Sequence, residues 1–138
     1  MSINPAKILL VEDSGFFRRA LTTNLENVGF AVTGATNGED AIKITRKERF
    51  DVIILDLHMP RMDGMLTLRI LNGRPETRGT PVVVVTANNK ADDRMTVRQL
   101  GAVYCPKGNL TFDALLGTIQ SCLSVNNPAA ALDKIKAS

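Results

Sequence analysis

The sequence predicts a three-layer α/β sandwich, in which helices cover both faces of a five-stranded parallel sheet. Five short apolar runs alternate with stretches of helical spacing along the 138 residues. Three of the runs are uninterrupted and rich in Val and Ile, which is typical of strands buried on both faces. The length is that of one domain, and a chain of this size buries about two thirds of its surface. We therefore expect one domain with its own core.

The strands are predicted by runs of three or four apolar residues, each bounded by turn or helix signals. In chain order the runs are Ile8 to Val11, Phe30 to Val32, Val52 to Leu55, Val82 to Val85 and Ala102 to Cys105. Parallel neighbours need a crossover between them, so we expect a helix in each interval.

Helix signals fill the intervals. In the first, four apolar residues form one stripe, and Gly29 stands where the helix should stop. Asn37 before two acidic residues starts a second helix, and Asp63 caps a third. Residues 92–100 form a fourth, and Thr111 begins a fifth. The stripe of the first helix is Phe17, Ala20, Leu21 and Leu25, and that of the fifth is Leu115, Leu116, Ile119 and Leu123.

Composition excludes several classes of protein. With 44% hydrophobic and 22% charged residues, and no apolar run beyond four, disorder and a membrane-spanning helix are not expected. The net charge of +3 comes from scattered residues, so direct nucleic-acid binding is not implied. No signal peptide is evident, and a reduced cytoplasm is expected, with Cys105 and Cys122 as core thiols. His58 is the only histidine, which excludes a Cys and His zinc cluster.

Polar residues follow the apolar runs, and ligands of open α/β sheets bind beyond the carboxyl ends of the strands. Glu12 and Asp13 follow the first run, Asp56 the third, Thr86 the fourth and Lys107 the last region. Each alone has an ordinary explanation as a turn former, a strand residue or a solvated charge. Their joint placement predicts a site with three carboxylates, one hydroxyl and one amine.

The residue types of this site suit phosphoryl transfer. Crowded carboxylates repel one another unless a cation lies between them, and oxygen ligands with room for water fit Mg²⁺. A metal would offset charge on the phosphoryl oxygens while a carboxylate attacks. Lys107 would contact one phosphoryl oxygen and the Thr86 hydroxyl another. The residues thus predict an aspartyl phosphate.

Four segments and one lysine form a recognisable pattern. They are Ile-Leu-Leu-Val-Glu-Asp-Ser at 8–14, Asp-Leu-His-Met-Pro-Arg-Met-Asp-Gly at 56–64, Val-Val-Thr-Ala at 84–87, Gly-Ala at 101–102, and Lys107. This pattern resembles the receiver domain of bacterial two-component response regulators, including the single-domain chemotaxis regulators, over residues 6 to about 124. The resemblance implies a flavodoxin-like sheet of order 2-1-3-4-5. It implies a receiver domain at 1–125, followed by a C-terminal extension at 126–138 that could hold a short helix.

The resemblance also implies roles for single residues. Asp56 matches the phosphoacceptor, and Glu12 and Asp13 match the acidic pair that holds Mg²⁺ together with Asp56. His58 would give its backbone carbonyl to the metal. The partners implied are a histidine kinase or histidine phosphotransfer protein as the donor, and a downstream protein target.

Three further positions match the switching and catalytic parts of the pattern. Thr86 and Tyr104 match the pair that changes conformation with phosphorylation, and Lys107 matches the amine that acts with Asp56 and Thr86. The signal would leave through the helix at 92–100, the strand at 102–105 and the helix that begins at Thr111. Such a protein catalyses its own phosphorylation and dephosphorylation and is not otherwise an enzyme.

The chain departs from the family pattern at two places. Glu12 stands where many members have Asp, which keeps the ligand type and lengthens the arm by one methylene. Lys107 is usually followed by Pro across a cis bond, but here Pro106 precedes it and Gly108 follows it. We therefore expect no cis bond after Lys107 and a different loop into the last helix.

Alternative functions stay open at this point. A degenerate receiver would bind partners without phosphorylation, and the unusual loop around Lys107 is compatible with that. A phosphatase with an aspartyl nucleophile would need an acid at the place of His58. A flavin or nucleotide binder would need a Gly-rich phosphate loop that the sequence lacks.

Overall fold

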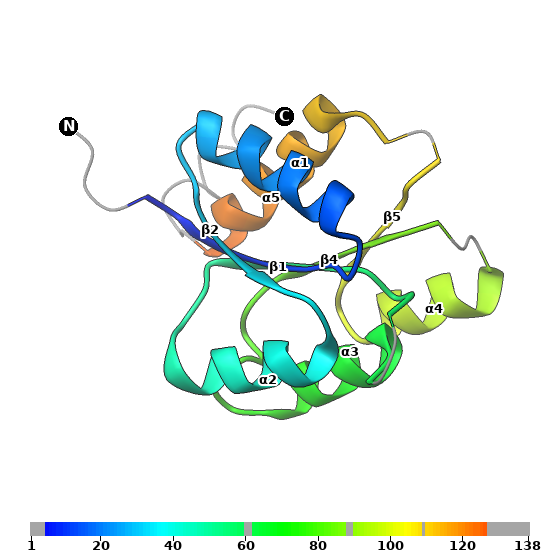
Figure 1. Ribbon diagram of the computed structural model, residues 1–138. Coiled ribbons are helices and arrows are strands. Elements are labelled where there is room, and N and C mark those ends of the chain that lie inside the picture. The colour runs from blue at the N-terminus through cyan, green and yellow to red at the C-terminus, as the bar shows by residue number, and fades with distance from the viewer. Residues whose placement is uncertain (1–4, 60–61, 88–89, 109, 127–138) are drawn as a thin grey trace.

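Strands and helices alternate strictly along the chain (Figure 1), which the computed structural model describes over residues 5–59, 62–87, 90–108 and 110–126. The elements are β1 (Lys7–Val11), α1 (Gly15–Asn27), β2 (Ala31–Ala35), α2 (Gly38–Lys47), β3 (Val52–Leu55), α3 (Gly64–Gly73), β4 (Val82–Thr86), α4 (Ala91–Gln99), β5 (Val103–Pro106) and α5 (Phe112–Asn126). The predicted alternation is confirmed. The short helix predicted beyond α5 lies outside the described residues.

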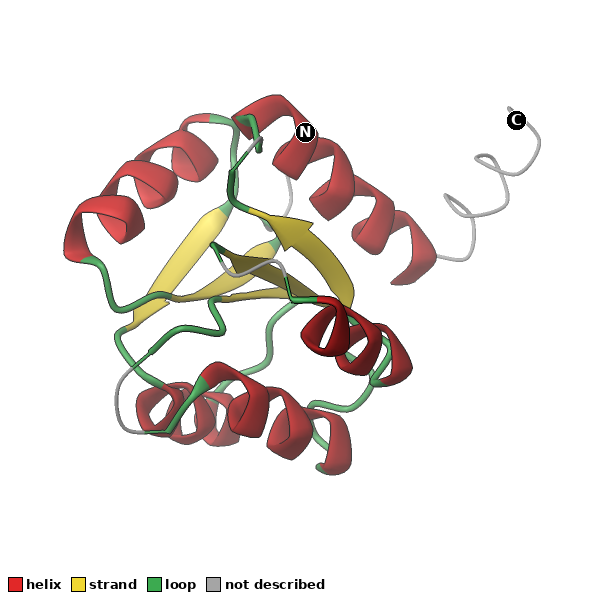
Figure 2. Cartoon of the chain, turned by 90° about the vertical axis from the view of Figure 1, so that its right-hand side faces the viewer, coloured by secondary structure: helices red, strands yellow, loops and turns green. Residues whose placement is uncertain are grey.

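The strands form one parallel sheet of order β2-β1-β3-β4-β5, which confirms the implied topology. Helices α1 and α5 cover one face of the sheet, and α2, α3 and α4 cover the other (Figures 1 and 2). Chain connections leave β1 and β3 toward opposite faces, which opens a crevice beyond their carboxyl ends. The predicted site residues therefore lie at the topological switch point of the sheet.

The register of the strands divides the interior into two cores, one on each face of the sheet. Consecutive side chains of a strand point to opposite faces, and pairs such as Leu9 with Ile53 lie directly beside each other. The core under α2, α3 and α4 includes Leu9, Val11, Ile53, Leu55, Val84, Leu68, Leu71 and Val97. The core under α1 and α5 includes Ile8, Leu10, Ile54, Val83, Leu25, Leu115 and Ile119. Both faces are buried, which explains the uninterrupted apolar runs.

Side-chain caps fix where the helices begin. The Asn37 carboxamide oxygen accepts a hydrogen bond from the Asp40 amide over 2.9 Å. The Asp63 carboxylate accepts one from the Leu66 amide over 2.8 Å. The Thr111 hydroxyl accepts from the Ala114 amide over 3.1 Å. These three predicted helix starts are confirmed. Gly29 has φ of 102°, a left-handed conformation that ends a helix at little cost for glycine.

The apolar residues of the predicted α1 stripe lie on one face of the helix, but that face is not buried along its whole length. Leu21 and Leu25 are buried, and Phe17 is partly buried, but Ala20 is exposed. Between α1 and the start of α5 lies a pocket of about 190 Å³, which Ala20 and Leu21 help to line. The two helices do not close over this stretch of α1, so the Ala20 methyl stays in contact with solvent.

Candidate functional site

The hydrogen-bond ladder of the sheet continues beyond the strands into the predicted site residues. The amides of Glu12 and Asp56 each donate to a carbonyl of a neighbouring strand over 3.0 Å. The Lys107 amide donates to the Thr86 carbonyl over 2.8 Å. The register of the sheet therefore fixes where the backbones of these four residues lie in space. The sequence alone gives only their order along the chain.

The structure brings the three predicted carboxylates together. One oxygen from each of Glu12, Asp13 and Asp56 lies within 4.8 Å of the other two. Glu12 is 1% exposed and Asp56 4% exposed, whereas Asp13 is exposed. Two carboxylates thus form the floor of the site, and the third lies at its rim.

Lys107 reaches this cluster from the end of β5. Its Nζ is 3.1 Å from Glu12 Oε1 and 3.5 Å from Asp56 Oδ2. The same ammonium lies over the Phe17 ring, 4.3 Å from the ring centroid. The predicted amine is therefore in contact with both buried carboxylates, although Gly108 rather than proline follows it. All peptide bonds of the described residues are trans.

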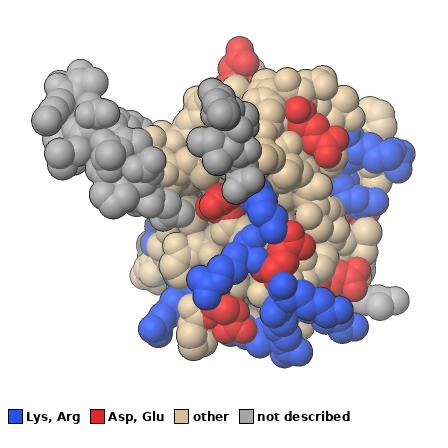
Figure 3. Space-filling view, turned by 90° about the vertical axis from the view of Figure 1, so that its left-hand side faces the viewer, with Lys and Arg blue, Asp and Glu red and all other residues tan. Residues whose placement is uncertain are grey.

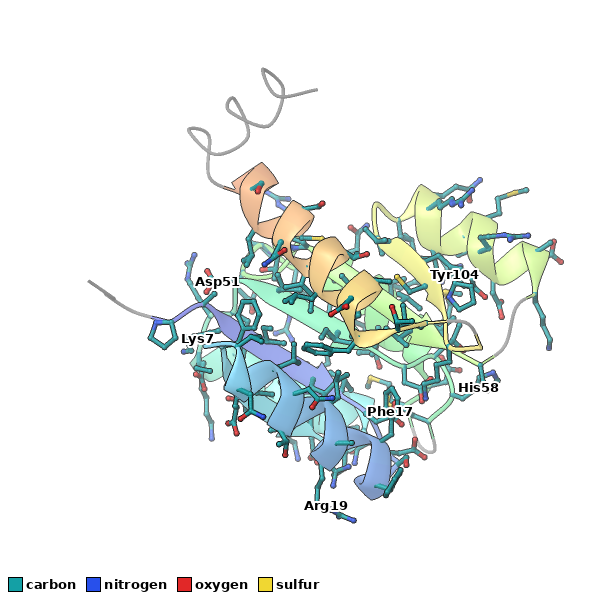
Figure 4. All side chains as sticks on the ribbon, turned by 90° about the horizontal axis from the view of Figure 1, so that it is seen from above. Lys7, Phe17, Arg19, Asp51, His58 and Tyr104 are labelled. Atoms are coloured by element: carbon teal, nitrogen blue, oxygen red, sulfur yellow. The ribbon has the colours of Figure 1, made fainter. Side chains whose placement is uncertain are left out.

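Backbone amides hold the buried carboxylates in place. The Ser14 amide donates to Glu12 Oε2 over 3.1 Å, and the His58 amide donates to Asp56 Oδ1 over 3.0 Å. The His58 side chain is exposed and lies at the carboxyl edge of the sheet (Figure 4), opposite Lys7 and Asp51. The role of the His58 carbonyl toward a metal stays a prediction.

Burial raises the pKa of Glu12 from 4.5 to about 7. The Ser14 amide opposes this shift by stabilising the charged form, the negative charge of Asp56 adds to it, and Lys107 opposes it again. A carboxyl held in this way takes up a proton easily when no cation is near. A divalent cation would compete with that proton for the same oxygen atoms.

Thr86 and Tyr104 lie on neighbouring strands. Thr86 is the last residue of β4 and is fully buried, at 0% exposed. Tyr104 lies opposite Val84 in β5, is partly buried, and packs against the core under α2, α3 and α4 (Figure 4). A coupled movement of the two side chains stays a prediction.

Arg18 supports the acidic loop and was not predicted from the sequence. Its Nη1 donates to the Glu12 carbonyl over 2.7 Å and contacts the Asp13 carbonyl at 3.5 Å. The side chain lies close to Gly34 of β2, where a Cβ atom would come within 3.2 Å of the Arg18 Cδ. Arg18 and Arg19 are adjacent, and the pattern alone does not distinguish which of them reaches the loop.

Gly64 belongs to the recognised motif, and the structure gives a physical reason for a glycine there. It opens α3, and its amide donates to the Leu57 carbonyl over 3.1 Å. A Cβ atom at this position would lie 2.3 Å from the Leu57 Cα and 2.4 Å from the Asp56 carbonyl oxygen. Only glycine lets α3 begin this close to the backbone of Asp56.

The donor set fits a hard divalent cation. All three convergent groups are carboxylates, and two are buried where unneutralised charge is costly. Glu12, Asp13 and Asp56 would hold such an ion, with the exposed side of Asp13 left open to water and to a phosphoryl group. The residues present therefore suit Mg²⁺.

Helix hydropathy and surface charge are two further properties of the molecule. Within the part of the chain that the structure describes, no helix has the length and hydropathy needed to cross a membrane. On the face shown in Figure 3, acidic and basic side chains are interspersed. The net charge of +3 is therefore not gathered into a basic patch on that face.

Fold and site together define a doubly wound α/β protein with a carboxylate cation site at its switch point. The family model for the response regulator receiver domain matches residues 8–120. The chain belongs to this family and is a receiver domain of two-component signalling, with a phosphoacceptor role.

Individual relatives agree with this assignment. Protein PilH of Pseudomonas aeruginosa is 34% identical over 119 residues, which are 86% of this chain and 98% of PilH. The chain spans only 39% of a probable transcriptional regulator ycf27 from Porphyridium aerugineum, at 35% identity over 70% of this chain.

Solved structures give the same result. Chemotaxis protein CheY4 of Vibrio cholerae matches with a TM-score of 0.80 and 29% identity, over 86% of this chain and 99% of that one. The receiver domain of sensor histidine kinase PA1611 from Pseudomonas aeruginosa matches with a TM-score of 0.78 and 26% identity, over 86% and 98% of the two chains. That structure has a magnesium ion coordinated in its active site cleft.

Proposed function

We propose that this receiver accepts a phosphoryl group on Asp56, in a Mg²⁺-dependent reaction, from a histidine kinase or histidine phosphotransfer protein. One observation carries the proposal: the recessed Asp56 carboxylate shares its site with two further carboxylates and with the Lys107 ammonium. Magnesium in the site of the PA1611 receiver supports the choice of metal. Glu12, Asp13, Asp56 and the His58 carbonyl would hold the ion.

The transfer uses Asp56 as nucleophile. A carboxylate oxygen forms a P–O bond while the P–N bond of the donor phosphohistidine breaks, and the bonding pair leaves on the imidazole nitrogen, which takes up a proton. When bound, Mg²⁺ offsets charge on the phosphoryl oxygens. Lys107 neutralises one of these oxygens, and the Thr86 hydroxyl donates a hydrogen bond to another.

The signal then leaves through the surface of α4, β5 and α5, where Tyr104 follows Thr86 into its new conformation. Apolar side chains already lie exposed on this surface: Met95 of α4 is 59% exposed and Val103 of β5 is 39% exposed. Such side chains suit a protein target better than a nucleic acid. We infer that the output is a contact with a downstream protein.

We also propose a division of the chain into a receiver domain and a C-terminal extension. Residues 1–125 make up the receiver, and residues 126–138 are an extension of it. Apart from its own phosphorylation and dephosphorylation the domain turns over no substrate. Its phosphodonors would meet it in the cytoplasm.

Acetyl phosphate tests the proposal because it supplies a phosphoryl group without a partner protein. The protein is incubated with acetyl phosphate and Mg²⁺, and the intact mass is measured. One phosphoryl adduct is expected for the wild type and for Asp51→Asn, an exposed aspartate at the opposite end of the sheet (Figure 4). No adduct is expected for Asp56→Asn or in EDTA. An unmodified wild type would favour a degenerate receiver.

A further inference from the structure

Phe17 supplies the one aromatic ring that lies within cation–π range of Lys107 among the described residues. The Lys107 Nζ is 4.3 Å from the ring centroid, well inside the roughly 6 Å range of this interaction. The same nitrogen contacts Glu12 Oε1 and Asp56 Oδ2. The ammonium therefore lies between two buried carboxylates and the electron-rich face of an aromatic ring.

The ring itself is fixed from two directions. The Phe17 amide donates to the Ser14 hydroxyl, the N-cap of α1, over 3.3 Å, which anchors its backbone in the first turn of the helix. Its side chain packs against the core under α1 and α5 and lines the pocket between these helices, together with Leu110 and Phe112. The core thus holds the ring on one side, whereas the lysine stem has four rotatable bonds.

We propose that Phe17 is a positioning residue for Lys107, holding its ammonium against the acidic cluster through a cation–π contact. A freely rotating lysine would lose side-chain entropy each time its ammonium neutralised a phosphoryl oxygen. With the ring in place, much of that entropy is already lost before the donor arrives. The link to phosphorylation rests on the function proposed above, but the contact itself can be tested without any phosphodonor.

The first experiment measures the contact directly by NMR. A ring current should move the Lys107 ε-CH₂ resonance upfield, and the resonance is assigned by its loss in Lys107→Met. In Phe17→Leu the shift should return to the range of the other lysines. Phe17→Tyr, which keeps the ring, should restore it. Phe112→Leu is the matched control: it removes an aromatic ring from the same pocket and should leave the Lys107 resonance where it is in the wild type.

The second experiment measures the rate of phosphorylation by acetyl phosphate in saturating Mg²⁺. Phe17→Leu should slow it by roughly two- to fivefold, the factor expected for losing one cation–π contact of ordinary strength. Phe17→Tyr should recover the wild-type rate, and Phe112→Leu should keep it. In the Lys107→Met background, adding Phe17→Leu should have no further effect, because no ammonium remains to be positioned.

The outcomes separate this inference from the proposed function. A wild-type Lys107 resonance without an upfield shift, or one that Phe17→Leu leaves in place, overturns the inference whatever the kinetics show. If Phe17→Leu and Phe112→Leu slowed phosphorylation equally, Phe17 would be only a packing residue. That outcome would also overturn the inference. If the wild type is not phosphorylated at all, the proposed function fails, and the NMR comparison still decides whether Phe17 holds Lys107.

Discussion

Glu12 is a carboxyl group that the fold buries beside a second carboxylate. Its longer arm, compared with aspartate, lets Oε2 accept from the Ser14 amide while Oε1 contacts Lys107. Burial nevertheless dominates and raises its pKa to about 7. A position expected to bind a metal therefore also titrates near neutral pH in the metal-free protein.

This shift predicts how stability depends on pH. The folded protein holds the Glu12 proton up to about pH 7, while the unfolded chain releases it near 4.5. Between these values the folded state binds more protons, so the Glu12 contribution to the free energy of unfolding falls as pH rises. The fall amounts to about 3 kcal/mol. Glu12→Gln should remove it.

Urea unfolding in EDTA at intervals from pH 4.5 to 8 measures the effect. The difference in unfolding free energy between Glu12→Gln and the wild type should grow across this window in favour of the variant. A difference that stays constant with pH would show that the Glu12 pKa is not raised. Glu39→Gln, an exposed acidic residue at the start of α2, serves as the control.

The sequence predicts the role of a residue in the site best when its side chain acts close to its own backbone. The three carboxylates follow directly from their places at strand ends, because short side chains stay near their strand. Arg18 and Phe17 reach the site from α1. The groups that they contact depend on the conformation of each side chain, as where the Arg18 side chain lies close to Gly34. No local pattern specifies such a conformation.

At the scale of elements, α3 shows how closely a helix can approach the site. Its first residue, Gly64, donates to the Leu57 carbonyl and leaves no room for a Cβ atom against the backbone of Asp56. The cap residue Asp63 fixes the same end of the helix. The start of α3 is therefore part of the wall that positions Asp56.

Gly64→Ala should destabilise the protein by roughly 3 kcal/mol, because the added methyl group must displace backbone rather than a flexible side chain. It should also slow phosphorylation of Asp56 by displacing the segment that carries it. Thermal unfolding and the acetyl phosphate assay measure the two effects. Gly73→Ala is the control: nothing lies within 4 Å of a Cβ atom there, and stability should change by less than roughly 1 kcal/mol. Equal effects of the two variants would contradict the argument.

Strands and helix starts are the elements that sequence patterns predict best, since an apolar run or a capping side chain is a local signal. The boundaries of β3 match the predicted run, and Asn37, Asp63 and Thr111 cap the helices as expected. The exposed Ala20 was missed for a tertiary reason. Its exposure depends on how far α5 lies from α1, which no pattern within α1 encodes.

At the scale of the whole molecule, the sheet order brings charged residues from distant parts of the chain into one site. These charges are close together only in the folded state, so the charge of the site affects the stability of the whole fold. Among the described residues, three carboxylates converge and Lys107 contacts two of them, so the excess of negative charge opposes folding when all three are charged. In EDTA at pH 8, Asp56→Asn should therefore raise the melting temperature. Differential scanning calorimetry measures this change.

Mg²⁺ should stabilise the wild type through the same imbalance. At ten times its dissociation constant, a ligand that binds only the folded state contributes about 1.4 kcal/mol, which corresponds to a rise of roughly 3 to 6 °C. Asp56→Asn should show a much smaller rise, and Asp51→Asn should respond as the wild type does. A wild-type melting temperature that tens of millimolar Mg²⁺ leave unchanged would contradict the proposed metal site.

The depth of Asp56 decides what shape of donor can reach it. Its carboxylate is almost wholly recessed, while Asp13 and His58 beside it are exposed. A phosphorylated side chain lying flush with a flat protein face would stop at these neighbours, before its phosphorus came within bonding distance. For the proposed transfer, we therefore expect a donor whose phosphorylated side chain projects beyond its own surface, or a small molecule. The shape of the site therefore restricts which donors can reach Asp56, independently of any specific contact between the two proteins.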